Sequence, residues 1–361
     1  MKTIVLVGGG HSHVYCVKML KEHKHPQMNW ILLSNSKKQY YSGMFSGFTE
    51  GLYAEEDTYI DLEKLAINSN ATFVEATVLS VDPIQQKILC SNGEVISYDI
   101  LSLDIGSTNK SPNIEGLTNE NLAIKPNEKF PDQIHTLRQA TNPVIIGGGA
   151  AGIEMALSLL AWQKKYSSRT DVTLLHSAPL LKGAGEKTSQ KITQLASKQG
   201  LKLVKDRAIR VDNSVVYTAG GSQIDFDTIM YLGGPHPPDL IKSAMLPTDE
   251  VGFLLVNSCL QTEAFPNIFG AGDCITISDQ KDMPKNGVNA VRQGPILFRN
   301  IMSFAFDEPL ESYTPKKADL AILSTGFKEG FFLYGRWSFH GKWAWFVKNF
   351  IDRRFMDKYR G

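Results

Sequence analysis

Short apolar runs that end in glycine, each followed by helical apolar spacing, are the dominant pattern of this chain. Residues 3–7 predict a buried strand, and the glycine turn at 8–10 leads into a stretch whose apolar positions recur every three to four residues. The same order recurs at the strand 144–146 and the glycine turn at 147–152. The pattern predicts an α/β fold with two Rossmann-like domains, each opening on a strand, a turn and a helix.

The glycine turns are predicted to bind phosphate groups. There the backbone approaches a pyrophosphate closely, and the helix that follows presents unpaired amides and the positive end of its dipole. In the first unit His13 stands where the third glycine of the dinucleotide fingerprint is typical, and Ser34 stands where a ribose-binding acid is typical. The contacts expected from this unit to a first dinucleotide come from Gly8, Gly10, His11, Ser12, His13 and Ser34.

Later segments are expected to complete the first dinucleotide site. The stretch 40–47 is rich in glycine and aromatic residues, residues 72–82 predict a strand, and the apolar strand at 98–107 ends in Gly-Ser as a crossover to the second domain. A strand that ends at a carboxylate spans 265–273, and a helix begins after 284–287. The expected contacts are Tyr41, Ser42, Gly43, Val78, Gly106, Gly272, Asp273, Lys285 and Gly287.

The second unit carries all three glycines of the fingerprint, which strongly favours dinucleotide binding there. His176 ends the next strand, 172–175, in place of the acid that favours NADH over NADPH, so either donor is compatible. Glu154, in the first turn of the helix, either pairs with the positive helix end or faces the nicotinamide. The apolar strand 229–235 is expected to return the chain to the first domain. The expected contacts are Gly147, Gly149, Ala150, Gly152, Glu154, His176 and Gly234.

Composition limits the class of protein. The chain has 361 residues, of which 42% are hydrophobic, so it can bury more than one core. A net charge of +1 argues against nucleic acid as the main partner. The four cysteines lack the spacing of a redox disulfide, and no group of Cys, His and carboxylates has metal-ligand spacing. The apolar run before the first glycine turn is too short for a signal sequence, so a cytoplasmic location is expected.

The tail from residue 331 to 361 is aromatic and basic. Seven Lys and Arg residues against two Asp residues give it a net charge of +5. Such a stretch either lies on the inner face of an anionic membrane and admits a lipid-soluble quinone, or packs on the first domain or on a second subunit of a homodimer. The residues that share one face of the predicted helix are Trp343, Phe346, Val347, Phe350, Ile351 and Phe355.

The order of these motifs resembles that of FAD-dependent pyridine nucleotide-disulfide oxidoreductases with two dinucleotide-binding domains. The shared features are the glycine turn at 8–10, the YDxLxLxxGS strand at 98–107, GGGAAGIE at 147–154 and FGAGD at 269–273. Within that superfamily the chain looks closest to type II NADH dehydrogenases, and closer still to the flavoprotein segment fused to selenide, water dikinases. The residues behind that finer resemblance lie at 8–13, 41–44, 101–107, 290–295 and 351–356.

The resemblance implies three parts: a discontinuous FAD domain at 1–112 and 245–325, an inserted NAD(P)H domain at 113–244, and a C-terminal segment at 326–361. FAD is expected to be bound without a covalent link. NADH or NADPH would pass a hydride to the flavin, and the electrons would leave to a quinone-like acceptor.

Two residues are expected to act in the reaction that the resemblance implies. Glu154 would help to place the nicotinamide, and Lys285 would stabilise the reduced flavin unless it is a solvated loop lysine. The alternative function is a redox-responsive flavoprotein, a partner or sensor that acts with another protein, in selenium metabolism for example.

Overall fold

The computed structural model describes residues 1–23, 25–109, 114–118, 123–125, 127–167, 171–316, 320–335 and 337–360. Its first parallel sheet has the order β18-β9-β1-β2-β5. In β1 the last four residues are buried, and Val5 lies opposite Ile31 on one side and Leu101 on the other. The strands are β1 (Lys2–Val7), β2 (Met28–Ser34), β5 (Thr72–Glu75), β9 (Ile100–Leu103) and β18 (Ile268–Gly270). These apolar runs suit a parallel sheet that is covered on both faces.

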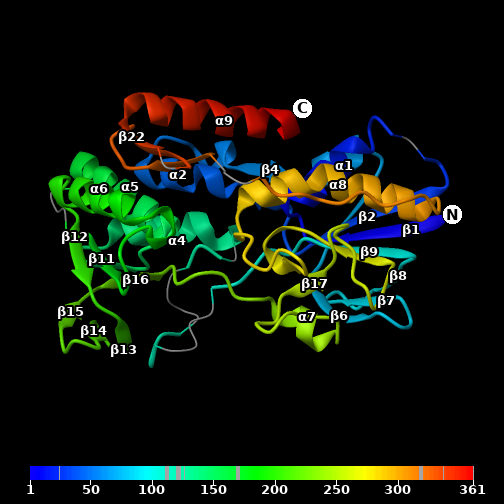
Figure 1. The fold of residues 1–361 in the computed structure, drawn as a ribbon, viewed down its shortest axis with the longest axis horizontal. Coiled ribbons are helices and arrows are strands. Elements are labelled where there is room, and N and C mark those ends of the chain that lie inside the picture. Colours follow the sequence, from blue (N-terminus) through cyan, green and yellow to red (C-terminus); the bar gives the residue numbers. More distant parts are fainter. Residues whose placement is uncertain are drawn as a thin grey trace.

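Helices α1 (His11–Met19) and α8 (Gly287–Ala305) pack against each other along the first sheet (Figure 1). α3 (Leu62–Asn68) packs on α1. Below the sheet in the same view lies an antiparallel layer of β6 (Val78–Asp82), β7 (Lys87–Cys90) and β8 (Val95–Ser97). The short helix α7 (Asp239–Ser243) packs against β6 of this layer.

The second parallel sheet has the order β12-β11-β10-β16. Its strands are β10 (Pro143–Ile146), β11 (Thr173–His176), β12 (Lys202–Lys205) and β16 (Thr228–Tyr231). The helices around it are α4 (Phe130–Gln139), α5 (Ala150–Tyr166) and α6 (Glu186–Lys198), and an antiparallel sheet of β13 (Ala208–Asp212), β14 (Val215–Thr218) and β15 (Gln223–Asp225) lies beside it (Figure 1). The two parallel sheets confirm the predicted α/β fold class.

Short elements connect the two sheets. α2 (Phe45–Glu50) packs on α5, and its Phe45 stacks on Phe130 of α4 with a centroid distance of 3.7 Å. A segment next to the first sheet thus contributes to the core of the second. The remaining pieces are β3 (Lys38–Tyr40), β4 (Tyr59–Asp61), β17 (Leu254–Val256), β19 (Ile275–Ile277), η1 (Ser42–Met44), η2 (Glu55–Asp57), η3 (Asn127–Lys129), η4 (Lys182–Ala184) and η5 (Gly272–Cys274).

The C-terminal part adds an antiparallel sheet and a long helix. The strands β20 (Leu320–Ser324), β21 (Gly330–Tyr334) and β22 (Trp337–Gly341) lead into α9 (Lys342–Arg360). α9, red in Figure 1, runs along the outside of the molecule toward α1. There Lys18 donates a hydrogen bond to the Lys358 carbonyl, and the Lys358 ammonium lies 4.8 Å from the Tyr15 ring centroid. Among the described residues, no helix combines the length and the apolar character needed to cross a bilayer.

One predicted strand is wrong. Residues 72–82 form two strands, because β5 pairs in parallel with β2 whereas β6 pairs antiparallel with β7. The chain leaves the first parallel sheet between them at residues 76 and 77. The predicted domain boundary at 112 and 113 lies outside the described residues, as does the basic residue Arg336 of the tail.

Candidate functional site

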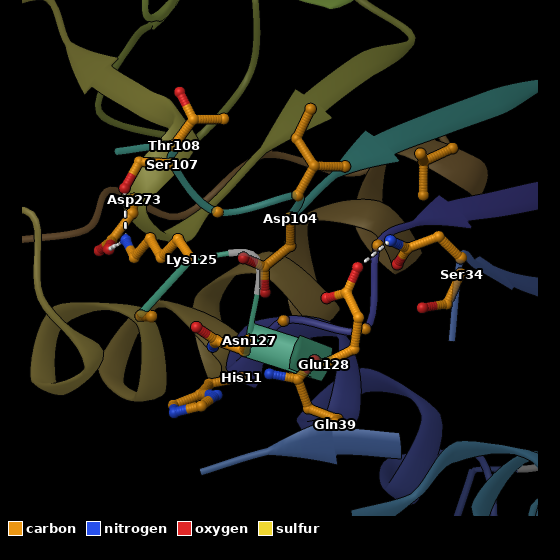
Figure 2. A pocket seen from close by; sticks show the side chains of 18 of the residues that line it. His11, Ser34, Gln39, Asp104, Ser107, Thr108, Lys125, Asn127, Glu128 and Asp273 are labelled. Atoms are coloured by element: carbon orange, nitrogen blue, oxygen red, sulfur yellow. Dashed lines mark hydrogen bonds and ion pairs between the residues drawn. The ribbon is translucent and has the colours of Figure 1, made fainter. Parts of the chain in front are cut away.

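The first cavity lies at the carboxyl ends of β1, β2 and β9 and has a volume of about 440 Å³ (Figure 2). This is the edge of a parallel sheet where nucleotides bind, and the volume is in the range of about 300–1,000 Å³ common for ligand sites. Nine of the predicted contacts line it, namely Gly8, Gly10, His11, Ser34, Ser42, Val78, Gly106, Asp273 and Gly287. Segments from both ends of the chain therefore meet here.

The glycine turn at 8–10 packs closely against Asp104, the residue that follows β9. Gly8 has φ +94°, and a Cβ there would lie 2.3 Å from the Asp104 carbonyl oxygen, so only glycine fits. A Cβ on Gly10 would lie 2.1 Å from the Asp104 carboxyl carbon. The backbone thus passes close to the end of β9, and it leaves the start of α1 facing the cavity.

His13, at the third fingerprint position, points away from the cavity. Its Nδ1 lies 2.7 Å from the Gly8 carbonyl and its Nε2 lies 2.8 Å from the Ser102 hydroxyl. These two hydrogen bonds join α1 to the glycine turn and to β9, in place of the close contact that glycine allows. The His13 ring therefore holds neighbouring elements together and is not part of the lining of the first cavity.

Three other predicted residues hold the surrounding elements together instead of lining the cavity. The Ser12 hydroxyl donates to the Ala290 carbonyl of α8 at 2.6 Å. The Gly272 amide donates to the Gln293 side chain at 2.7 Å. The Gly43 carbonyl accepts from the buried Lys348 ammonium.

Tyr41 contacts α9 and does not line the cavity. Its ring stacks on Phe355 with a centroid distance of 4.4 Å, and its hydroxyl donates to Asp352 at 3.0 Å. The same ring also touches His11, which does line the cavity. Tyr41 therefore links α9 to the wall of the first cavity.

Lys285 is not brought to the cavity. Its ammonium donates to the Ile275 carbonyl and, at 3.1 Å, to the Thr276 hydroxyl, and it lies 3.7 Å from the Phe253 ring centroid. Burial lowers the pKa of this lysine. The side chain satisfies the backbone beside β19, so the structure offers no contact through which it would stabilise a ligand in the first cavity.

Three charged residues that the sequence reasoning missed line the same cavity. Lys125 forms an ion pair with Asp273 at 2.8 Å and also donates to Ser107. Glu128 accepts from the Asn35 amide at 2.8 Å across the cavity, as the dashed line in Figure 2 shows. Asp104 is only 3% exposed and projects into the middle of the pocket (Figure 2). The sequence does contain a signal for Asp104, because an acidic residue within an apolar run two positions before Gly106 indicates a polar role at the strand end.

The residues of the first cavity fit an elongated dinucleotide. Ser34 lies at one end and Asp273 at the other, with the start of α1 between them (Figure 2). The His11 ring is 8% exposed, and its Nε2 has no hydrogen-bond partner among the described residues. Because burial lowers the pKa of His11 to about 4, the ring is neutral near pH 7 and is able to donate to or accept from a ligand.

The second cavity lies at the carboxyl ends of β10, β11 and β16 and has a volume of about 750 Å³. Five predicted contacts line it, namely Gly147, Gly149, Ala150, His176 and Gly234. Gly152 lies beneath it, where a Cβ would approach the Gly147 carbonyl oxygen to 1.9 Å, so this glycine permits the close packing of helix on strand. Around Gly149 a Cβ would meet nothing within 4 Å, and the start of α5 is exposed.

Glu154 lines neither cavity. Its carboxylate accepts from the Ser324 amide of β20 at 2.8 Å, and burial raises its pKa. The structure thus gives Glu154 a contact that neither predicted role describes: it attaches the C-terminal sheet to α5. The charge of Lys348 on α9 acts in the opposite direction and lowers the pKa of Glu154.

Among the described residues, the cysteines form no disulfide, and the His, Cys, Asp and Glu side chains form no metal site. All four cysteines are free, and Cys16, Cys90 and Cys274 are buried. No group of three or more His, Cys, Asp or Glu residues within the described part of the chain is arranged to hold a metal ion.

Comparisons with known proteins agree with this geometry. Ferroptosis suppressor protein 1 of Taeniopygia guttata is 24% identical over 344 residues, which cover 91% of this chain and 87% of that protein. The sulfide:quinone oxidoreductase structure from Aquifex aeolicus has a TM-score of 0.84 at 21% identity, covering 100% of this chain and 92% of that one. NDH2 from Plasmodium falciparum, solved with NADH, has a TM-score of 0.82 at 12% identity, with coverage of 99% and 98%.

The family model described as pyridine nucleotide-disulphide oxidoreductase matches residues 2–294, which include both glycine turns and the crossover strands. This confirms the predicted resemblance at the level of the family. The chain belongs to the pyridine nucleotide-disulphide oxidoreductase family.

Proposed function

We propose that the protein is an FAD-dependent NAD(P)H:quinone oxidoreductase, with FAD in the first cavity and NADH or NADPH in the second. The observation that supports this best is the presence of two separate cavities, each at the carboxyl edge of a parallel sheet and each lined by a glycine turn at a helix start.

The residues of each cavity have distinct roles in this proposal. Ser34 holds the ribose of the FAD adenosine at one end of the first cavity, and His11, Gly287 and the Lys125–Asp273 pair contact the part of FAD toward the flavin. In the second cavity the open space at Gly149 receives the nicotinamide dinucleotide. FAD, when bound, supplies the chemistry of accepting a hydride and releasing electrons one or two at a time. The chain's own task is to place the two cofactors and exclude water.

NADH and NADPH both remain compatible with the second cavity. His176 is buried at the end of β11 and lines the cavity, where an acid would repel a 2′-phosphate. Lys182 and Arg207 line the same cavity and are able to pair with such a phosphate, whereas Asp206 opposes it.

A quinone is the acceptor we favour. The Aquifex aeolicus relative is named as a sulfide:quinone oxidoreductase, and its fold covers this whole chain. The finer relation to the flavoprotein segment of selenide, water dikinases rests on sequence motifs alone. It supports the second candidate, a redox-responsive flavoprotein that acts with another protein.

Steady-state turnover separates the two candidates. We expect the FAD-loaded protein to oxidise NADH or NADPH continuously in the presence of a soluble quinone, at a rate of at least about 1 per second, as is common for enzymes. A single slow reduction without turnover, together with a stable complex with another protein, would instead support the sensor.

The exposed apolar stripe of α9 is the feature that supports membrane contact. Trp343, Phe346 and Phe350 are 48%, 60% and 63% exposed. The expectation that this face packs on the first domain is wrong for these residues, because α9 packs through another face that includes Ala344, Trp345 and Met356. Two residues of the predicted stripe are partly buried: Phe355, which contacts Tyr41, and Val347.

We propose that this stripe lies on an anionic membrane surface. Trp337 and Phe339 of β22 are 67% and 48% exposed next to it, and Lys342, Arg353 and Arg354 on α9 are also exposed. Aromatic side chains beside basic ones are typical of helices that lie in the lipid interface. A second subunit that covers the same face is the other outcome to be tested.

The membrane proposal predicts the behaviour of a triple variant, Trp343→Ser, Phe346→Ser and Phe350→Ser. Because these side chains are exposed, the variant is expected to keep its fold and FAD content while losing flotation with phosphatidylserine-containing liposomes. Truncation at residue 331 is a poorer test because it removes the buried residues Phe331, Met356 and Tyr359. Flotation of the variant equal to that of the unchanged protein would contradict the proposal, and a dimer that dissociates on substitution would indicate a subunit interface instead.

A further inference from the structure

The start of α1 already holds an anionic group of the protein itself. The Asp104 carboxylate accepts from the Ser12 amide at 2.8 Å and from the His13 amide at 3.3 Å, which are in the first turn of the helix. These amides belong to the helix end at which the glycine turn is expected to present a diphosphate. The carboxylate therefore occupies donors that a bound dinucleotide would use.

Both glycine motifs of the first cavity are folded around this carboxylate. A Cβ on Gly10 would lie 2.1 Å from the Asp104 carboxyl carbon, and a Cβ on Gly272 would lie 2.3 Å from its Oδ1. Asp104 is 3% exposed and lines the cavity, between Ser34 on one side and the Lys125–Asp273 pair on the other (Figure 2). The side chain is thus held in the middle of the site by packing as well as by hydrogen bonds.

The second cavity differs in this respect. At the start of α5, Gly149, Ala150 and Ala151 are exposed, and the space beside Gly149 is open. One glycine turn of this chain thus presents a free helix end to its cavity, whereas the other meets a carboxylate of its own protein.

The carboxylate has no cation to balance it within the described residues. Lys125 is paired with Asp273, and Asp273 itself adds a second negative charge near Asp104. A diphosphate at the same helix end would add further negative charge in a buried place, where like charges repel strongly. One of the groups has to lose its charge or move.

We infer that Asp104 couples FAD binding to the uptake of one proton: the carboxylate takes a proton from solvent as the diphosphate of FAD reaches the start of α1. This inference rests on the FAD site proposed above. The neutral carboxyl no longer repels the diphosphate, and its O–H is able to donate to a phosphate oxygen. Asp104 is therefore a positioning residue whose charge sets how tightly the cofactor is held.

The burial of Asp104 and the charges near it bring protonation of its carboxylate close to neutral pH. Burial is the main cause that raises the pKa of Asp104 to about 7, against which the amides of His13 and Ser12 act, and the charge of Asp273 raises it further. Burial lowers the pKa values of His11 and His13 to about 4, so both are neutral between pH 6 and pH 8.

The other neighbours do not replace Asp104 as the titrating group. Burial raises the pKa of the Cys16 thiol and raises that of Cys274 to about 12. α8 contributes the uncharged Gln293 and Ala290 beside Gly272. Among the described residues, the other charged side chains that line this cavity are the paired Lys125 and Asp273, and Glu128, which accepts a hydrogen bond from Asn35.

The test is the dissociation constant of FAD, measured by flavin fluorescence on the full chain after removal of bound cofactor. For the unchanged protein we expect FAD to bind about tenfold more weakly at pH 8 than at pH 6, because one proton is taken up on binding. Asp104→Asn keeps the shape and removes the charge. It is expected to bind FAD with the same dissociation constant at both pH values, and about tenfold more tightly than the unchanged protein at pH 8.

Calorimetry of the unchanged protein gives an independent readout that does not depend on the variant folding. FAD binding at pH 8 in two buffers of different ionisation enthalpy is expected to reveal the uptake of close to one proton. A dissociation constant that is equal at pH 6 and pH 8, or an Asp104→Asn variant with an unchanged pH dependence, would overturn the inference while leaving the FAD site intact. No binding of FAD at any pH would overturn both.

Discussion

Replacement of Gly149 by Trp is expected to abolish reduction by NADH and NADPH while leaving FAD bound. A Cβ at Gly149 meets nothing within 4 Å, and the residue has φ −79°, so a large side chain is accepted by the backbone and fills the second cavity. Displacement of the nicotinamide by about 1 Å already costs roughly a hundredfold in rate. We therefore expect the rate of flavin reduction, measured by anaerobic stopped-flow absorbance, to fall at least about a hundredfold.

The controls for Gly149→Trp come from the same turn. Gly149→Ala adds a single methyl group to the open space and is expected to change the rate far less. Gly152→Ala is expected to destabilise the second domain, because its Cβ would lie 1.9 Å from the Gly147 carbonyl oxygen. Loss of FAD together with loss of reduction in Gly149→Trp would show that the two cavities are not separate sites.

Replacement of Lys348 by Met is expected to destabilise the folded protein by several kcal/mol, far more than replacement of a cation in an exposed ion pair. The Lys348 and Asp352 side chains are 12% and 5% exposed and lie 2.9 Å apart, with Glu154 close by. Although burial lowers the pKa of Lys348, the charges of Asp352 and Glu154 hold it above its usual value. Removal of the cation leaves the buried carboxylates of Asp352 and Glu154 without the positive charge that balances them, which costs about 3–5 kcal/mol. Urea denaturation of the apoprotein measures this loss.

A solvent-exposed ion pair supplies the matched control. Arg299 and Glu311 lie 2.6 Å apart, and each side chain is 51% exposed, so Arg299→Met is expected to cost less than about 1 kcal/mol. The loss of stability in Lys348→Met is expected to be smaller at pH 5 than at pH 8, because burial raises the pKa of Glu154 and protonation of that carboxyl at the lower pH removes part of the uncompensated charge. Adding Asp352→Asn to Lys348→Met is expected to restore part of the stability. Equal small losses for Lys348→Met and Arg299→Met would contradict a buried role for this pair.

The main features of the fold could be predicted from the sequence because they depend on local patterns. β1 and β10 are apolar runs that end in glycine, and each leads into a helix as expected. The break between β5 and β6 could not be predicted, because alternation continues through residues 72–82 while the partner strand changes. Pairing partners far apart in the sequence decide such a break.

The candidate site could be predicted where glycines and strand ends determine it. Gly8, Ser34 and Asp273 line the first cavity because each lies at the carboxyl end of a parallel strand or just beyond it. Lys285 illustrates the limit: its long side chain turns toward the Ile275 carbonyl, and no local pattern indicates that direction. Lys125 reaches the first cavity from a segment that was predicted to belong to the other domain.

The orientation of α9 could not be predicted for a related reason. The apolar stripe was visible in the sequence, and the face that packs on the protein was not. That packed face contains Lys348 and Asp352, a buried ion pair that looks polar in a hydropathy pattern. The apolar face of an amphipathic helix usually faces the core, but here the pairing of Lys348 with Asp352 allows a face with two charges to be buried.

The most direct test of the whole account is anaerobic mixing of the FAD-loaded protein with NADH or NADPH, followed by a soluble quinone. The flavin absorbance is predicted to bleach with at least one of the two donors and to return when the quinone is added. A protein that takes up no FAD, or whose flavin stays oxidised with both donors, would contradict the claim that this chain uses two adjoining dinucleotide sites to move electrons.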